Sequence, residues 1–301
     1  MAPKTAKAAV KRLQETGHNV TLTDTHAGIL NKVEQGSTVV VNSKDFFDGT
    51  KYKFGALGDT HLYSKYERLD VLNCLYDIYE REGIKTVFHT GNIVEGECRF
   101  NKFDLVGPAG MGRAVDYCVK NYPRRDGITT KFITGEDHEG WWIQREGVNV
   151  GKYIQMVAED AGRKDLEWIG HVEADVRFKA DNGEAWMRVM HPGGGSAYAI
   201  SYTEQKLVES FQGGNKPHIL LIGHYHKLSQ GYPREVHTVQ TGCTQDQTPF
   251  LRRQKIQVHV GGTIVRFNQA DTGEINRFSV EFIPFYDQQF YEKNDKYSRW
   301  S

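Results

Sequence analysis

The chain lacks an excess of charge of either sign. Its 301 residues include 38 Lys and Arg and 38 Asp and Glu, which gives a formal net charge of zero. This balance excludes a protein that coats nucleic acid through a uniformly basic surface, and it excludes a strongly acidic tail protein. A charged partner must therefore meet a local patch. A chain of this length can bury a sizeable core, in one large domain or two ordinary ones.

Long apolar runs and paired cysteines are also missing. No apolar stretch approaches the ~18 residues of a membrane-spanning helix, so the sequence predicts no membrane partner. The basic N-terminal segment has no apolar centre and does not have the pattern of a secretory signal. The four cysteines lie far apart without a Cys-x-x-Cys pair, which indicates reduced thiols. We therefore expect a cytoplasmic protein.

Residues 51–223 alternate between short β-branched runs and longer helical stretches. The strand candidates are 51–58, 84–91, 128–135, 184–191 and 217–224, and the helix candidates are 67–82, 111–121, 148–162 and 198–212. This order predicts layered α/β structure. After residue 223 the helices stop, and the segments 237–242, 256–268 and 275–285 predict a β-rich end.

Residues 1–45 have a different pattern. Residues 5–16 predict a basic amphipathic helix that stops at Gly17, and residues 19–30 predict a small β-hairpin. A basic helix before a hairpin is similar to the end of a winged helix, which would contact DNA. The alternative is an arm that packs on the body. We therefore expect an N-terminal arm over 1–45, a main domain over 46–285 and a C-terminal tail over 286–301.

Five strand candidates end in residue types that bind metal ions. The endings are Gly58-Asp59-Thr60-His61, His89-Thr90-Gly91-Asn92, Gly135-Glu136-Asp137-His138-Glu139, His191-Pro192 and Gly223-His224-Tyr225-His226. In open α/β sheets, groups beyond the carboxyl ends of the strands share one crevice, so these five endings can form one site. Each ending alone is a weak signal, but five in order favour a metal centre. Histidine, carboxylate and amide ligands together suit manganese or iron, with zinc and magnesium as alternatives.

These endings resemble, in the same order, the pattern of the calcineurin-like metallophosphoesterase superfamily: DxH, GD, GNH followed by D or E, H, and GHxH. The resemblance covers roughly residues 52–228, and the variant endings look most like phage and prophage-associated members. It implies a four-layer α/β fold, a β-sandwich flanked by helices, here with a small N-terminal helix-hairpin extension. It also implies a phosphoesterase with two metal ions, in the cytoplasm of a bacterium or a phage-infected host cell.

The resemblance assigns a role to each motif residue. Seven residues would hold the two divalent ions, manganese by preference: Asp59, His61 and His226 the first ion, Asp137, His191 and His224 the second, and Asn92 both. His138 would not bind metal. It would contact the phosphate and either stabilise the transition state or protonate the leaving oxygen.

Two coupled positions depart from the family pattern. The bridging position, an aspartate in the family, is Asn92, and the position before the catalytic histidine, an asparagine in the family, is Asp137. A neutral amide bridges two cations poorly. Three outcomes stay open: Asp137 bridges instead, Glu95 or Glu136 contributes, or one metal site is weak. His89, Glu95 and Glu136 are also candidates to orient the ligands from behind.

Side chains next to the catalytic motif are candidates to contact a substrate. Trp141 and Trp142 would stack on bases and Arg145 would bind phosphate, or both tryptophans would pack under the following helix.

These features predict a metal-dependent phosphodiesterase or nuclease that acts on DNA. The first alternative is a phosphatase or nucleotide phosphodiesterase for small substrates, which the neutral charge favours. The second is a non-catalytic scaffold like the small subunits of some replicative polymerases. Relatives that act on DNA often dimerise, so a homodimer is a further expectation.

Overall fold

The structure is a computed structural model that describes residues 20–22, 27–29, 36–42, 51–97, 102–195 and 197–285. Contacts divide the chain into a unit of residues 1–35 and a unit of residues 36–301. In the first unit, β1 (Val20–Leu22) pairs antiparallel with β2 (Ala27–Ile29), as the predicted hairpin requires. The predicted helix over 5–16 and the tail over 286–301 lie outside the described residues.

The described part of the second unit contains one hydrogen-bonded sheet of twelve strands. They are β3 (Gly36–Asn42), β4 (Lys51–Leu57), β5 (Thr86–His89), β6 (Thr129–Thr134), β7 (Leu166–His171), β8 (Glu173–Lys179), β9 (Glu184–Met190), β10 (Ile219–Ile222), β11 (Leu228–Gly231), β12 (His237–Thr241), β13 (Gly261–Gln269) and β14 (Ile275–Pro284). The strand order is β11-β12-β10-β9-β8-β3-β7-β6-β5-β4-β13-β14.

Strand β3 joins two halves of this sheet. It pairs in parallel with β8 along its whole length, but it meets β7 only through Gly36 and Gly170. β3 therefore lies in the sheet although residues 36–42 fall within the expected arm over 1–45. The three-part division of the chain stays a prediction.

The two halves of the sheet enclose an apolar core. In β4 every second side chain faces this core, so Tyr52 and Phe54 meet residues of β8, β9 and β13. The Tyr52 ring stacks on Phe267 at 4.5 Å between ring centroids, and Phe178 meets Tyr52 edge-on at 4.9 Å. Burial of each such side chain is worth about 1.5–3 kcal/mol, so this interface is a main source of the stability of the fold.

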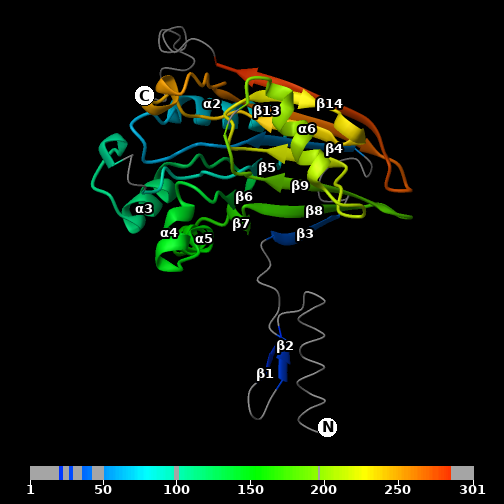
Figure 1. Cartoon of the computed structure of the whole chain (residues 1–301), viewed down its shortest axis with the longest axis horizontal. Helices are drawn as coiled ribbons and strands as arrows, with labels where there is room; N and C mark the ends of the chain where they lie inside the picture. Colours follow the sequence, from blue (N-terminus) through cyan, green and yellow to red (C-terminus); the bar gives the residue numbers. More distant parts are fainter. Residues whose placement is uncertain are drawn as a thin grey trace. The chain divides into compact units, whose positions relative to one another are not determined.

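Helices cover the outer faces of the two halves (Figure 1). Four helices pack against the half that contains β4 to β7: α2 (Leu69–Arg81), α3 (Met111–Asn121), α4 (Gly140–Glu146) and α5 (Val150–Asp160). On the other half, α6 (Ile200–Ser210) packs Val208 against Leu220 and Ile222 of β10. The order helix, sheet, sheet, helix confirms the predicted four-layer α/β fold.

Short helical segments lie in the connections. They are α7 (Pro249–Arg253) and the 3-10 turns η2 (Lys102–Asp104) and η3 (Pro233–Glu235). None of the helices in the described ranges is long and apolar enough to cross a membrane.

The strand directions decide where the functional motifs lie. β4, β5, β6 and β7 run parallel to one another, and β9, β10 and β12 also run parallel. The segments that follow β4, β5, β6, β9 and β10 therefore carry the five motifs beyond the carboxyl ends of these strands.

Candidate metal centre

Backbone hydrogen bonds hold the motif segments against one another. The N–H of Asp59 donates to the carbonyl of Gly91 at 2.9 Å, and the N–H of His61 donates to the carbonyl of Asn92 at 3.0 Å. Glycine is required where side chains meet: a Cβ on Gly135 would lie only 2.4 Å from Oδ1 of Asn92. The glycines before the motifs thus leave space for the functional side chains.

Six motif residues adopt the left-handed backbone conformation, with φ between 45° and 76°. They are Asp59, His61, Asn92, His138, His224 and His226. This conformation costs non-glycine residues on the order of 1 kcal/mol or more each, and strain of this kind clusters at functional sites. The hydrogen-bonded strand ends maintain it, and it turns side chains from four of the five motif segments toward one region.

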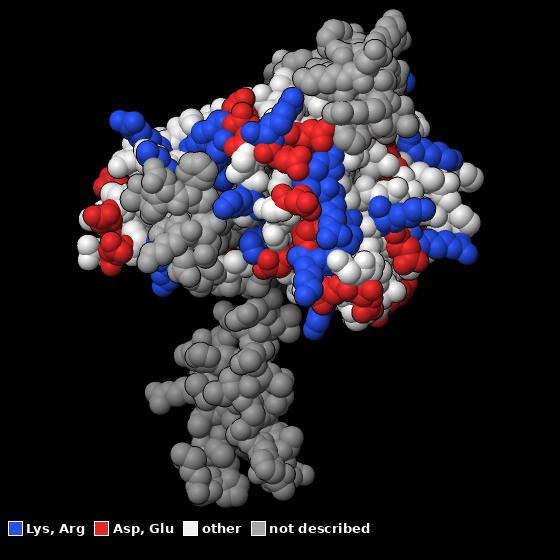
Figure 2. Space-filling view, turned by 180° about the vertical axis from the view of Figure 1, so that it is seen from behind, with Lys and Arg blue, Asp and Glu red and all other residues white. Residues whose placement is uncertain are grey.

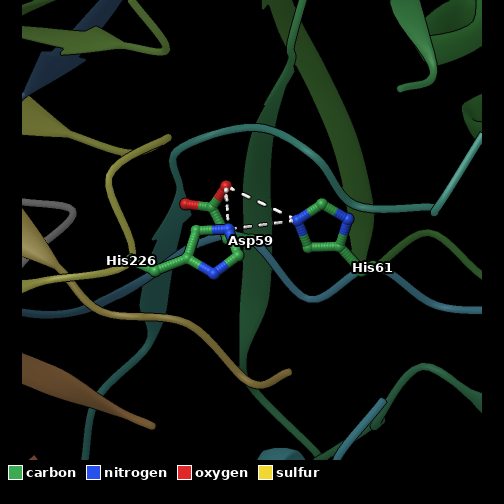
Figure 3. A group of neighbouring side chains, drawn as sticks. All are labelled: Asp59, His61 and His226. Atoms are coloured by element: carbon green, nitrogen blue, oxygen red, sulfur yellow. Dashed lines mark hydrogen bonds and ion pairs between the residues drawn. The ribbon is translucent and has the colours of Figure 1, made fainter. Parts of the chain in front are cut away.

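Asp59, His61 and His226 form a buried group that we call cluster A (Figure 3). Nε2 of His226 lies 3.4 Å from Oδ1 of Asp59 and 3.3 Å from Nε2 of His61, and the distance from His61 Nε2 to Asp59 Oδ1 is 3.7 Å. Ligands of one transition-metal ion stand about 3–3.5 Å apart when each bond is about 2.1 Å. Cluster A therefore fits a single cation.

Asp137, His191 and His224 form a second group, cluster B. Oδ1 of Asp137 lies 3.5 Å from Nε2 of His191, and Oδ2 lies 3.4 Å from Nδ1 of His224. Nδ1 of His191 is 2.6 Å from the carbonyl oxygen of Thr90 and donates to it, because a carbonyl can only accept. Nε2 of His191 is then the basic nitrogen, and it is buried without a hydrogen-bond partner.

Asn92 lies between the two clusters. Its Nδ2 donates to Oδ1 of Asp59 at 3.4 Å, while its Oδ1 is buried without a hydrogen-bond partner. Buried polar atoms without partners cost about 1–3 kcal/mol each, and a cation would satisfy both this oxygen and Nε2 of His191. The donor set of both clusters therefore fits divalent metal ions.

The two aspartates of the clusters remain ionised. Burial raises the pKa of Asp59, but His226 and His191 lower it further, so that it ends well below its ordinary value. Burial also raises the pKa of Asp137, and the nearby imidazoles of His191 and His224 lower it to a greater extent. The buried charge of Asp59 and the partly exposed charge of Asp137, both beside imidazole groups, provide the electrostatic field that a divalent cation needs.

Glu95 connects cluster A to His138. Its Oε2 lies 2.9 Å from Nδ1 of His61, and its Oε1 lies 3.5 Å from Nδ1 of His138. Gln245 donates to Oε2 of Glu95 at 3.0 Å. Nδ1 of His138 also donates to the main-chain oxygen of Glu95 at 3.0 Å. Burial lowers the pKa of His138, but the Glu95 charge more than offsets this and the pKa rises to about 10.

Glu139 fixes the segments on either side of the site. Its carboxylate is fully buried and accepts from the N–H groups of Val94 at 3.0 Å and Gly135 at 2.9 Å. Burial raises the pKa of Glu139 to about 7. The third motif contains Glu139 directly after its histidine, but sequence analysis assigned no role to this residue. Gln245 carried no sequence signal, because it contacts Glu95 across 150 residues.

His89 lies behind the site and contacts the backbone of the motif segments. The N–H of Gly91 donates to Nδ1 of His89 at 3.2 Å, so Nε2 carries the proton and donates to Oγ1 of Thr60 at 3.1 Å. Thr60 in turn donates to the carbonyl of Ile93 at 2.8 Å. His89 therefore organises the two segments that carry Asp59 and Asn92.

The residues predicted to contact a substrate differ in their solvent exposure. Trp142 is only 1% exposed and packs in the core under the helices, whereas Trp141 is 38% exposed. Of the two rings, only Trp141 offers a face to a substrate. Arg145 is exposed and pairs with Glu146 at 2.8 Å, with Glu97 3.9 Å away.

Glu136, predicted as a possible contributor to the site, lies outside both clusters. It is exposed, and its main-chain oxygen accepts from Nε2 of Gln144 at 3.1 Å. Its carboxylate belongs to none of the three groups of possible metal ligands found among the described residues: cluster A, cluster B, and His61 with Glu95 and His138.

No family model and no curated protein matches the chain. Among solved structures, an archaeal phosphodiesterase is similar at 15% identity and a TM-score of 0.39, over 76% of this chain and 99% of that one. Vps29 from Entamoeba histolytica, complexed with zinc, is similar at 14% identity and a TM-score of 0.33, over 78% and 99%. The 5'-nucleotidase precursor of Thermus thermophilus is similar at 11% identity and a TM-score of 0.40, over 78% and 54%. All three TM-scores are below 0.5, so these similarities assign no function to the chain.

Proposed function

We propose that this chain is a metal-dependent phosphoester hydrolase of the calcineurin-like metallophosphoesterase superfamily. One observation carries the proposal: clusters A and B lie on either side of Asn92, with His138 beside cluster A. Each cluster supplies three nitrogen and oxygen ligands, and the motif order agrees with the family resemblance.

Cluster A and cluster B would each hold one divalent ion, with manganese as the expected metal. When bound, such a pair of ions activates a water molecule and offsets the negative charge of a phosphoryl group. The protein contributes rigid placement, because backbone N–H groups of the segments that carry the ligands donate hydrogen bonds to Glu139 and His89.

His138 supplies the proton chemistry in this proposal. Its side chain is 30% exposed, so it borders the solvent-accessible side of the site, whereas His61 is buried. Glu95 holds its ring from behind through Nδ1, which leaves Nε2 for a substrate. A protonated imidazole at this place donates a hydrogen bond to a phosphoryl oxygen or a proton to the leaving oxygen.

Within this reaction class we propose a phosphodiester of DNA as the substrate. Trp141 and Arg145 lie on α4, which begins directly after the His138 motif, and they offer a ring for stacking and a cation for phosphate. The competing substrate is a small phosphate ester. On the face shown in Figure 2 basic side chains lie beside acidic ones, and such a mixed surface favours this alternative.

The test of the reaction class uses manganese-loaded protein and bis(p-nitrophenyl) phosphate. We expect turnover, and we expect His138→Ala to lower kcat by about 10²–10⁴-fold while the manganese content stays unchanged. A protein that binds no manganese and gives no turnover would instead be a scaffold.

The test of the substrate class measures retention on DNA. Binding that weakens steeply between low and physiological salt supports DNA, since basic groups then displace counterions from phosphates. Absence of retention at low salt, together with turnover of nucleotides, would establish the small-substrate alternative.

A further inference from the structure

An open question of this site is which group carries negative charge between the two metal ions. The sequence left Asp137, Glu95 and Glu136 as replacements for the neutral Asn92. The Asp137 carboxylate pairs with the two histidines of its own cluster B. Glu95 meets His61 at Nδ1, the nitrogen on the other side of the ring from cluster A, and Glu136 belongs to neither cluster. None of the three therefore faces both clusters.

Asp59 does face both clusters with a single oxygen. Its Oδ1 lies 3.4 Å from Nε2 of His226 and 3.7 Å from Nε2 of His61, which are the ligand nitrogens of cluster A. The same oxygen lies 3.9 Å from Nε2 of His191, which belongs to cluster B. These values are close to the ~3–3.5 Å between two ligands of a shared ion.

The backbone fixes the Asp59 carboxylate in this position. The N–H of His224 donates to Oδ2 of Asp59 at 2.8 Å, and the N–H of Asp59 itself donates to the carbonyl of Gly91 at 2.9 Å. Because Oδ2 is held on the side of the β10 segment, Oδ1 turns toward the histidine nitrogens of both clusters.

Asn92 has a different orientation. Its Nδ2 donates to Oδ1 of Asp59, so its own Oδ1 points away from that carboxylate. This oxygen and Nε2 of His191 both approach Gly135, at 2.4 Å and 3.1 Å from the position that a Cβ would occupy there. The free oxygen of Asn92 thus lies on the side of cluster B.

From this geometry we propose that Asp59 supplies the carboxylate oxygen shared by both metal ions, and that Asn92 provides a neutral ligand to the cluster B ion alone. The inference rests on the proposed two-metal function. It makes Asp59 common to two sites, so that its loss weakens both, whereas loss of Asn92 weakens one.

The experiment measures manganese stoichiometry, the two affinities and the electron paramagnetic resonance spectrum of the full chain. For the natural sequence we expect two ions per chain with a spin-coupled spectrum. Fewer than two ions would overturn the proposed two-metal function itself, independently of which residue is shared.

Two variants separate the assignments. In Asp59→Asn we expect the coupling to disappear and both ions to bind at least tenfold more weakly. In Asn92→Ala we expect the coupling to remain, with only one ion weakened. The assignment is overturned if Asn92→Ala abolishes the coupling, or if Asp59→Asn retains one ion at its original affinity.

A matched control and a folding check complete the design. Asp116→Asn removes an exposed carboxylate on α3 and should leave both affinities and the spectrum unchanged. Circular dichroism verifies that each variant is folded. If Asp59→Asn does not fold, the Asn92→Ala spectrum decides alone, because retained coupling supports the proposal and lost coupling contradicts it.

Discussion

Oε2 of Glu95 lies 2.9 Å from Nδ1 of His61, so a buried carboxylate holds the ring of a proposed metal ligand from behind. This contact leaves Nε2 of His61 as the nitrogen that faces cluster A. Carboxylate partners of this kind fix the tautomer of a metal-binding histidine and increase its basicity. The same carboxylate reaches His138, which links metal binding to the proposed proton chemistry.

Glu95→Gln is expected to weaken manganese binding by about 10–100-fold, because the neutral amide no longer increases the basicity of His61. Manganese titration monitored by calorimetry measures this effect. Glu97→Gln is the matched control, since Glu97 pairs with Lys102 and Arg145 outside the clusters. Equal losses of affinity in the two variants would contradict a specific role of Glu95.

Glu139→Gln is expected to lower the free energy of unfolding by about 1–3 kcal/mol. The amide nitrogen would face one of two backbone N–H groups that now donate to the carboxylate, and one donor would stay unsatisfied. Urea unfolding of the metal-free protein measures the loss. The exposed Glu136→Gln should change stability by less than ~0.5 kcal/mol, and a similar loss there would refute the mechanism.

We expect Trp142→Ala to affect the stability of the protein and Trp141→Ala to affect substrate binding. Trp142 is buried in the core, so its truncation is expected to destabilise the protein by about 3–5 kcal/mol. Trp141 is partly exposed, so its truncation should spare stability but raise KM for a DNA substrate through the loss of ~1–3 kcal/mol of stacking. Thermal unfolding and steady-state kinetics separate the two effects. An unchanged KM in Trp141→Ala would exclude it from substrate binding.

His89 should make the protein less stable in acid. Burial lowers its pKa from the ordinary value of 6.5 to about 3, so between these values the unfolded chain binds a proton that the folded chain does not. Stability is therefore complete above pH 6.5 and falls as the pH decreases toward 3, by about 2 kcal/mol from pH 7 to pH 5 for this residue.

Urea unfolding at pH 7 and pH 5 tests this expectation. His89→Asn cannot take up a proton, so its decrease in stability between the two pH values should be smaller than that of the natural sequence by about 2 kcal/mol. Equal decreases would mean that His89 is not the group responsible.

Removal of divalent metal should lower the melting temperature, because the charged groups of the clusters lose their common partner. At a metal concentration of about 100 times Kd, binding adds roughly 2.7 kcal/mol of stability per site. Melting curves with chelator and then with added manganese measure the change. In Asp137→Asn we expect added manganese to raise the melting temperature by a smaller amount. An undiminished rise in that variant would argue against metal binding at cluster B.

The strands and helices were predictable where their patterns are long. The segment 111–121 forms α3 with the predicted bounds, and 51–58 forms β4 almost to the residue. β8 was missed although Ala174, Val176 and Phe178 alternate with polar residues as in a half-buried strand. The seven-residue α4 was missed because it is too short for a helical period to appear.

The sequence by itself determined which residues can meet, because five glycine-containing motifs at strand ends in an α/β order lead to one edge of the sheet. It named the members of both clusters and the fold. Only the tertiary structure decided their orientation: which oxygen of Asp59 faces His191, where the Asn92 amide points, and that Trp142 is buried. These depend on left-handed backbone turns and on contacts across more than 100 residues, such as His224 with Asp59, which no local pattern encodes.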